Sequence, residues 1–288
     1  MRLTAVFLSF ILLALASPAA LAHDAESTLD KIERTGEFVI GFRADASPLS
    51  YVNADGQPSG YSVDLCGRIA AAVNAHFGDQ EIETIYRRID ADDRIAAVVE
   101  GRIDIECGST TITLSRQEQV DFTLPTFVTG GSVLSLTKTG IQSMADLAGK
   151  KVGVAKGTTT VEEVKLLLEQ NAIDAELVIV DNRDIGMQML NRGGIDALAS
   201  DQIVLIGQII EAVDPKRYSL VSEVFSYEPY GLVLRRNDAD FRLLVNRALS
   251  RLYASGEHAD IFYKWIGRIG ITLPPILGAM YQLSTIPE

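Results

Sequence analysis

The chain has 288 residues, 47% of them hydrophobic and 22% charged, a composition that excludes a disordered or fibrous protein and allows a large buried core. This length is typical of two lobes of ordinary domain size. The formal net charge of −12 argues against a nucleic-acid partner. The same negative charge weakly repels small anions, so any anionic ligand must be captured by local arginines. The two cysteines show no metal-ligand spacing, and we expect no metal and no cofactor.

The first 22 residues have the pattern of a signal peptide. Arg2 precedes an apolar run over residues 3–16, and Ala20-Leu21-Ala22 matches the small-x-small site that a signal peptidase cuts. The run is too short for a comfortable membrane span, and no cysteine at the cut would carry a lipid. We therefore expect a chain that starts at His23 and is exported to the periplasm.

The early chain alternates strands and helices. Strand patterns cover residues 37–42, 82–88 and 103–105. Two helices lie between them: the first has Ser62 as its predicted N-cap and ends at Gly78, and the second covers residues 92–99. This β-α-β-α-β order predicts a mostly parallel sheet with right-handed crossovers.

A cluster of hydroxyl side chains follows the strand at 103–105. It comprises Ser109, Thr110 and Thr111, with Thr113 and Ser115 as candidate helix caps and Arg116 in the first helical turn. Free backbone N–H groups and short hydroxyls at a helix start can bind a carboxylate, and a guanidinium can add two parallel hydrogen bonds. An ordinary polar turn between a strand and a helix explains the same spacing.

The pattern restarts after residue 131. Strands are predicted over residues 132–137, 151–155 and 177–180, and helices over 143–147, 160–170 and 185–190. The segment GGID at 193–196 repeats GRID at 101–104, which indicates two similar half-units. The chain then returns through a strand at 232–234 and helices at 240–253 and 258–265.

Two crossings between lobes are predicted, near Thr129 and near Tyr230. They divide the chain into a first lobe of residues 23–129 plus 230–288 and a second lobe of residues 130–229. Ligands of open α/β sheets bind beyond the carboxyl ends of the strands. The cleft should therefore collect a set of polar side chains: Arg43, Ser109, Thr111, Thr158 and Asp201.

The two cysteines, Cys66 and Cys107, leave two interpretations open. An exported protein is in a compartment that allows disulfides, and an even count is compatible with a bond between them. Two buried free thiols that pack as small apolar residues are equally compatible with the sequence.

Several longer segments together resemble one family over almost the whole exported chain. They are GFRADASPLSYV, GYSVDL, ECGSTTITLSRQEQVDFT, VGVAKGTTT, the segment around Asp201, and LYASGEHADIFYKW. The chain resembles the periplasmic solute-binding proteins of polar amino acid ABC transporters, most closely their glutamate/aspartate-binding branch. The resemblance implies an α/β two-lobe periplasmic binding protein fold of type II. It also implies a monomer that closes on L-glutamate or L-aspartate and delivers it to an inner-membrane permease.

The resemblance also implies a role for individual residues. Arg116 would bind the ligand α-carboxylate, and Asp201 the α-ammonium group. Arg43 and Arg94 would bind the side-chain carboxylate, and Arg183 aligns where the branch often has a histidine. Hydroxyl groups that would add hydrogen bonds to the α-carboxylate belong to Ser109, Thr111, Thr158 and Thr159.

Each of these side chains also has a simpler interpretation. Arg43 could be a solvated charge at a strand end, Arg94 a charge on a helix face, and Asp201 a helix cap. The three histidines form no constellation with Ser or Cys, which argues against a nucleophilic triad.

The main alternative from another class is an enzyme on the same fold. The resemblance extends to periplasmic dehydratases that act on cyclic carboxylic acids, such as a cyclohexadienyl dehydratase-like lyase. Glu106 would then be the candidate general acid or base. Three arginines and one aspartate suit a dicarboxylic amino acid better than a ring, so we expect a binding protein and no catalytic residue.

Overall fold

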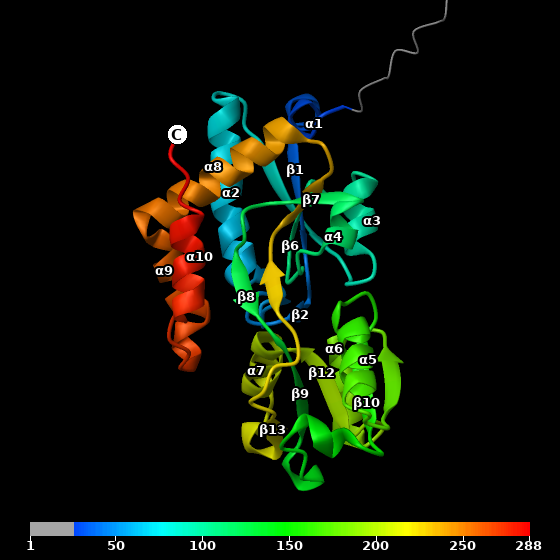
Figure 1. The fold of residues 1–288 in the computed structure, drawn as a ribbon. Helices are drawn as coiled ribbons and strands as arrows, with labels where there is room; N and C mark the ends of the chain where they lie inside the picture. Colours follow the sequence, from blue (N-terminus) through cyan, green and yellow to red (C-terminus); the bar gives the residue numbers. More distant parts are fainter. Residues whose placement is uncertain (1–25) are drawn as a thin grey trace, which may run out of the picture.

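The computed structural model describes residues 26–288, so the predicted signal peptide lies outside the described part of the chain. Two lobes, each built around a five-stranded sheet, lie one above the other in Figure 1. The first sheet has the order β5 (Glu83–Arg88), β1 (Glu37–Phe42), β6 (Ile105–Cys107), β15 (Val233–Arg235), β7 (Val120–Phe122). The second has the order β11 (Glu176–Val180), β10 (Lys151–Ala155), β12 (Ala197–Asp201), β9 (Gly131–Leu136), β13 (Tyr218–Leu220).

Two strands cross between the lobes side by side. β8 (Phe127–Thr129) and β14 (Glu228–Tyr230) pair antiparallel, and they lead directly into β9 and β15. Both β9 and β15 enter their sheets antiparallel to the neighbouring central strand, β12 or β6. The prediction of a mostly parallel sheet in the first lobe is confirmed, because β5, β1, β6 and β7 run in the same direction and only β15 runs against them. In the second sheet only β9 runs against the other four strands. A chain that arrives at the carboxyl ends of the parallel strands must run in the opposite direction through the sheet.

Helices cover both sheets. The first lobe carries α1 (Thr28–Thr35), α2 (Tyr61–Phe77), α3 (Arg94–Val99), α4 (Leu114–Gln117), α8 (Ala239–Ser255), α9 (Glu257–Trp265) and α10 (Pro275–Leu283). The second carries α5 (Thr160–Gln170), α6 (Arg183–Arg192) and α7 (Gln202–Glu211). A small sheet of β2 (Asp45–Ala46), β3 (Ser50–Val52) and β4 (Pro58–Ser59) lies in the first lobe, and short 3-10 turns cover Thr137–Thr139, Met144–Leu147, Pro215–Arg217 and Gly267–Ile269.

The C-terminal helices complete the core of the first lobe. Phe241, Leu249, Phe262 and Tyr281 are buried in one cluster with residues of β1 and α2, and Figure 1 shows α8, α9 and α10 beside α2. Burial of this apolar surface stabilises the lobe by the hydrophobic effect. In residues 26–288 no helix is both long and apolar enough to cross a membrane.

Some element boundaries differ from those predicted. α2 starts at Tyr61 with Gly60 at its N-cap, so the prediction that Ser62 caps this helix is wrong. The Ser62 hydroxyl instead donates to the carbonyl of Gly108 at 2.7 Å. The third strand of the first lobe begins at Ile105, two residues later than predicted. The helix start expected at residue 92 lies at Arg94.

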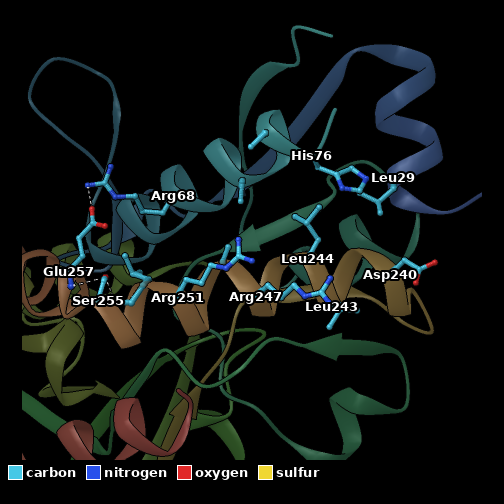
Figure 2. Close-up of a pocket in the computed structure, with 14 residues that line it drawn as sticks. Leu29, Arg68, His76, Asp240, Leu243, Leu244, Arg247, Arg251, Ser255 and Glu257 are labelled. Atoms are coloured by element: carbon cyan, nitrogen blue, oxygen red, sulfur yellow. Dashed lines mark hydrogen bonds and ion pairs between the residues drawn. The ribbon is translucent and has the colours of Figure 1, made fainter. Parts of the chain in front are cut away.

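A groove of about 840 Å³ lies between α2 and α8 in the first lobe, and Figure 2 shows its lining. Its rim includes Arg68, Arg247 and Arg251, and the dashed line in Figure 2 joins Arg68 to Glu257. None of the residues predicted to bind a ligand lines this groove.

Candidate functional site

Three arginines of the first lobe point toward the junction between the lobes. Arg43 directly follows β1, and Arg94 is the first residue of α3; their exposed fractions are only 1% and 2%. Arg116 lies in α4, whose N-cap is Thr113, as predicted: the Thr113 hydroxyl accepts the backbone N–H of Arg116 at 3.1 Å. The half-buried Arg116 side chain is held by the carbonyl of Thr111, to which Nη1 donates at 2.8 Å.

The second lobe contributes a fourth arginine and an aspartate. Arg183 opens α6 and is 1% exposed, and Asp201 is the last residue of β12. Arg183 donates from Nε to the hydroxyl of Ser200 at 2.8 Å and from Nη2 to Oδ2 of Asp201 at 3.1 Å. Asp201 occupies the N-cap position of α7, but its side chain makes no capping hydrogen bond, which leaves the carboxylate to other partners.

One set of contacts joins the lobes around Gly157. Its carbonyl accepts hydrogen bonds from Nη2 of Arg94 at 3.1 Å and from Nη2 of Arg116 at 3.4 Å. The hydroxyls of Thr111 and Thr159 lie 3.3 Å apart, and Thr159 also donates to Oε2 of Glu228 at 3.1 Å. The Thr158 hydroxyl instead donates to the carbonyl of Ala155 at 2.7 Å, within its own lobe.

A second set of contacts joins the lobes around Asp45. Oδ1 of Asp45 accepts from Nη2 of Arg43 at 2.6 Å, and Oδ2 accepts the backbone N–H of Arg183 at 3.1 Å. A carboxylate at the N-terminus of a helix is favoured by the helix dipole. These contacts hold the lobes together, an arrangement called closed below, and they bring predicted ligand-binding residues together from both lobes.

Many buried polar atoms at this junction have no hydrogen-bond partner in residues 26–288. The donors are Nε and Nη1 of Arg43, Nε of Arg94 and Nη1 of Arg183. The acceptors are Oδ1 of Asp201 and Oε1 of Glu106, and the hydroxyls of Ser109 and Tyr230 can act as either. Buried polar groups without partners are costly, so this cluster indicates a site for a ligand that carries both carboxylate and ammonium groups.

The arginines strongly affect one another. Burial lowers the pKa of Arg94 well below its ordinary value, and the charge of Arg116 lowers it further. Burial also lowers the pKa of Arg43. Burial alone would lower the pKa of Arg183, but the carboxylates of Asp45 and Asp201 raise it above the ordinary value. A ligand carboxylate beside Arg43 and Arg94 would likewise oppose the lowering of their pKa values by burial.

Cys66 and Cys107 form a disulfide that joins α2 to the last residue of β6. This bond holds the helix beside the loop that carries Ser109 and Thr111. In residues 26–288 no group of three or more His, Cys, Asp or Glu side chains could hold a metal ion.

Asp45 and Glu228 belong to this site, although the sequence did not single them out. Asp45 follows Arg43 by two residues in the GFRAD segment, a spacing that places both near the carboxyl end of β1. Glu228 lies on the crossing strand β14, in a segment that was predicted only as a crossing between the lobes near Tyr230. An acidic residue in an otherwise apolar crossing segment was the available signal.

Comparison with known proteins agrees with this geometry. Residues 38–268 match the bacterial extracellular solute-binding proteins, family 3. A protein of Pseudomonas aeruginosa named L-glutamate/L-aspartate-binding protein is 34% identical over 256 residues, or 88% of this chain and 85% of that one. The glutamate/aspartate import solute-binding protein of Escherichia coli is 31% identical over 261 residues, or 89% of this chain and 86% of that one.

Two solved structures share the fold. An ancestral arginine-binding protein bound to arginine has a TM-score of 0.71 and 29% identity, over 80% of this chain and 98% of that one. An ancestral amino acid-binding protein described as a precursor of cyclohexadienyl dehydratase has a TM-score of 0.71 and 27% identity, over 83% of this chain and 99% of that one. With two sheets, paired crossing strands and a polar site between the lobes, the chain belongs to family 3 of the bacterial extracellular solute-binding proteins.

Proposed function

We propose that this protein binds an acidic L-amino acid, glutamate or aspartate, between its lobes and delivers it to the permease of an ABC transporter. The observation that carries the proposal is that buried arginine N–H groups and Oδ1 of Asp201, all at the junction between the lobes, have no hydrogen-bond partner in the described part of the chain. Guanidinium groups pair with carboxylates through charge-assisted hydrogen bonds, and a carboxylate oxygen accepts from an ammonium group. The names of the Pseudomonas and Escherichia relatives support the same ligand class.

Each end of the ligand has its own partners in this proposal. Arg116, with the hydroxyls of Ser109 and Thr111, binds the α-carboxylate, and Asp201 binds the α-ammonium group. The hydroxyls of Thr158 and Thr159, expected from the resemblance to join them, instead donate to the carbonyl of Ala155 and to Glu228. Arg43 binds the side-chain carboxylate, because among residues 26–288 neither its Nε nor its Nη1 has a partner. Arg94 contributes its Nε, since its other nitrogens already donate to the carbonyls of Ser109 and Gly157. Arg183 contributes its Nη1, which has no hydrogen-bond partner in residues 26–288 and lies 4.0 Å from Oδ1 of Asp45.

Delivery requires that the lobes open and close. The first lobe comprises residues 23–129 and 230–288, and the second comprises residues 130–229. Because β8 and β14 connect the two lobes, these strands act as the hinge. The protein works as a monomer in the periplasm after removal of residues 1–22, and the permease recognises the closed, ligand-bound form.

The same proposal assigns no catalytic activity to the chain. A dehydratase needs a general acid or base within hydrogen-bond reach of the reacting group. Glu106 is fully buried behind Gly108 and holds the Thr110 hydroxyl, which suits a structural or electrostatic role better than proton transfer to a ring. Three arginines and Asp201 also match the charges of a dicarboxylic amino acid.

A ligand screen tests the proposal. The chain from residue 23 is unfolded, dialysed to remove bound ligand and refolded, and its unfolding temperature is measured with each of the twenty amino acids. Glutamate and aspartate should give the largest increases, since a ligand at a hundred times its Kd adds about 2.7 kcal/mol to stability. Stabilisation by neutral or basic amino acids alone would overturn the acidic specificity. Loss of water from a cyclic carboxylic acid would favour the enzyme instead.

A further inference from the structure

Glu106 is a fully buried carboxylate beneath the ligand-binding loop. It lies in the middle of β6 and has no exposed surface. Gly108 makes room for it: a Cβ atom on Gly108 would lie 2.1 Å from Oε1 of Glu106 and 2.9 Å from Cγ of Arg43. Only a residue without a side chain fits at position 108, so the fold brings the carboxylate against Arg43.

Hydrogen bonds from residues 26–288 reach only one of the two carboxylate oxygens of Glu106. The Thr110 hydroxyl donates to Oε2 at 2.7 Å, while Oε1 has no partner in residues 26–288. Burial of an ionised carboxylate without full pairing costs several kcal/mol, and nearby positive charge must offset that cost. Burial lowers the pKa of Arg43, Arg94 and Arg116, and the Glu106 charge opposes that lowering at all three.

We propose that Glu106 determines specificity by offsetting part of the positive charge of Arg43, Arg94 and Arg116, which limits how strongly the site prefers a dicarboxylic over a neutral amino acid. This inference rests on the proposed function. Three like charges held together repel one another in the ligand-free protein, and a carboxylate beside them lowers that repulsion. The same carboxylate repels the ligand's carboxylates, so affinity for glutamate stays below the value that three arginines alone would give.

The test separates the charge of Glu106 from its hydrogen bond. Glu106→Gln removes the charge but keeps an oxygen that accepts from Thr110. Thr110→Val removes that hydrogen bond but keeps the charge. Glu106→Asp keeps a carboxylate but draws it back by one methylene group. Calorimetry measures Kd for glutamate and for glutamine with the wild type and the three variants, and circular dichroism confirms that each folds.

Glu106→Gln should increase the ratio of glutamine Kd to glutamate Kd about tenfold, which equals about 1.4 kcal/mol, and should lower the unfolding temperature of the ligand-free protein. Thr110→Val should change both Kd values by the same factor and leave the ratio unchanged. Glu106→Asp should give a ratio between those of the wild type and Glu106→Gln. It replaces Glu106→Gln as the test if that variant does not fold.

A ratio in Glu106→Gln that stays within twofold of the wild type, or falls, would overturn the inference. So would a Thr110→Val variant that raises the ratio as much as Glu106→Gln, because the effect would then come from the loop and not from the charge. If the wild type binds neither ligand, it is the proposed function that fails, and the inference fails with it.

Discussion

The backbone N–H of Arg183 donates to Oδ2 of Asp45 at 3.1 Å, which ties the first residue of α6 in the second lobe to β2 in the first. The other oxygen of Asp45 lies 2.6 Å from Nη2 of Arg43 and 4.0 Å from Nη1 of Arg183. One carboxylate thus contacts both lobes, and its contacts with Arg183 can exist only while the lobes are closed.

Asp45→Asn should weaken the closed form. The amide keeps the shape of the side chain but loses its charge, and hydrogen bonds to charged groups contribute roughly 1.5–3 kcal/mol. We expect Kd for glutamate to rise at least about tenfold. Small-angle scattering should show that the variant remains open at ligand concentrations that close the wild type. Asp55→Asn, at an exposed turn of the same lobe, is the matched control and should bind as the wild type does. Unchanged affinity in Asp45→Asn would rule out this role.

Gly207 is a place where the closed lobes leave no room for a side chain. It lies inside α7, and a Cβ atom there would be 2.1 Å from the carbonyl oxygen of Ser47 in the first lobe. Alanine is a better helix former than glycine by about 1 kcal/mol. Gly207→Ala should therefore keep or raise the stability of the ligand-free protein while it raises Kd for glutamate at least about tenfold.

Gly67→Ala gives the control for this prediction. Gly67 lies in α2, and a Cβ atom there would meet nothing within 4 Å. The substitution should add a similar stability and leave ligand binding unchanged. Urea unfolding and calorimetry on both variants measure the two effects separately. Tight binding by Gly207→Ala would mean that the lobes close less far than described.

The stability of the fold should depend on pH through Glu228. Burial raises the pKa of Glu228 above 4.5, the charge of Asp201 raises it further, and hydroxyl hydrogen bonds oppose the rise. Asp201 and Glu228 both lie in the second lobe, so the contribution of Asp201 to this raised pKa does not depend on closure. A group whose pKa is raised in the folded state stabilises the fold at low pH and loses that contribution as the pH rises, so the free energy of unfolding should fall as the pH increases above 4.5. Urea unfolding of the ligand-free protein from pH 4.5 upward should show this slope in the wild type and a flatter one in Glu228→Gln.

The disulfide should stabilise the fold and the ligand loop together. It closes a loop with a sequence separation of 41 residues, for which loop entropy predicts a contribution of about 4 kcal/mol. The unreduced, denatured protein should show no titratable thiol, and reduction should lower the midpoint of urea unfolding. Two free thiols in the unreduced protein would contradict the bond.

The repeated segments GRID and GGID could be recognised from sequence, and the structure confirms that they are equivalent. Oδ2 of Asp104 accepts the backbone N–H of Val39, and Oδ2 of Asp196 accepts that of Lys151, each at 2.8 Å. Both aspartates thus join a central strand to its parallel neighbour. Short-range patterns of this kind are local, so the sequence is enough to predict them.

Contacts between the lobes were not predictable in the same way. Asp45 meets Arg183 across 138 positions of the chain, and its sequence context shows only a polar residue after a strand. The direction of β9 and β15 likewise depends on where the crossing strands enter each sheet, which no local pattern records. The candidate arginines were visible as residue types, but the atoms left without partners could be identified only from the packed structure.

Different arginines should bind the side-chain carboxylate and the α-carboxylate of the ligand. Arg43→Lys keeps a positive charge but loses the forked donors Nε and Nη1, which are without partners in the described chain. We expect Kd for glutamate to rise about tenfold or more while Kd for glutamine changes less, so that the preference for glutamate narrows. Arg116→Lys should weaken both ligands by a similar factor, because both present the same α-carboxylate. Arg94→Lys should narrow the preference less than Arg43→Lys, since its two terminal nitrogens already donate to backbone carbonyls. Calorimetry with both ligands measures all three variants, and full glutamate preference in Arg43→Lys would assign the side-chain carboxylate to another arginine.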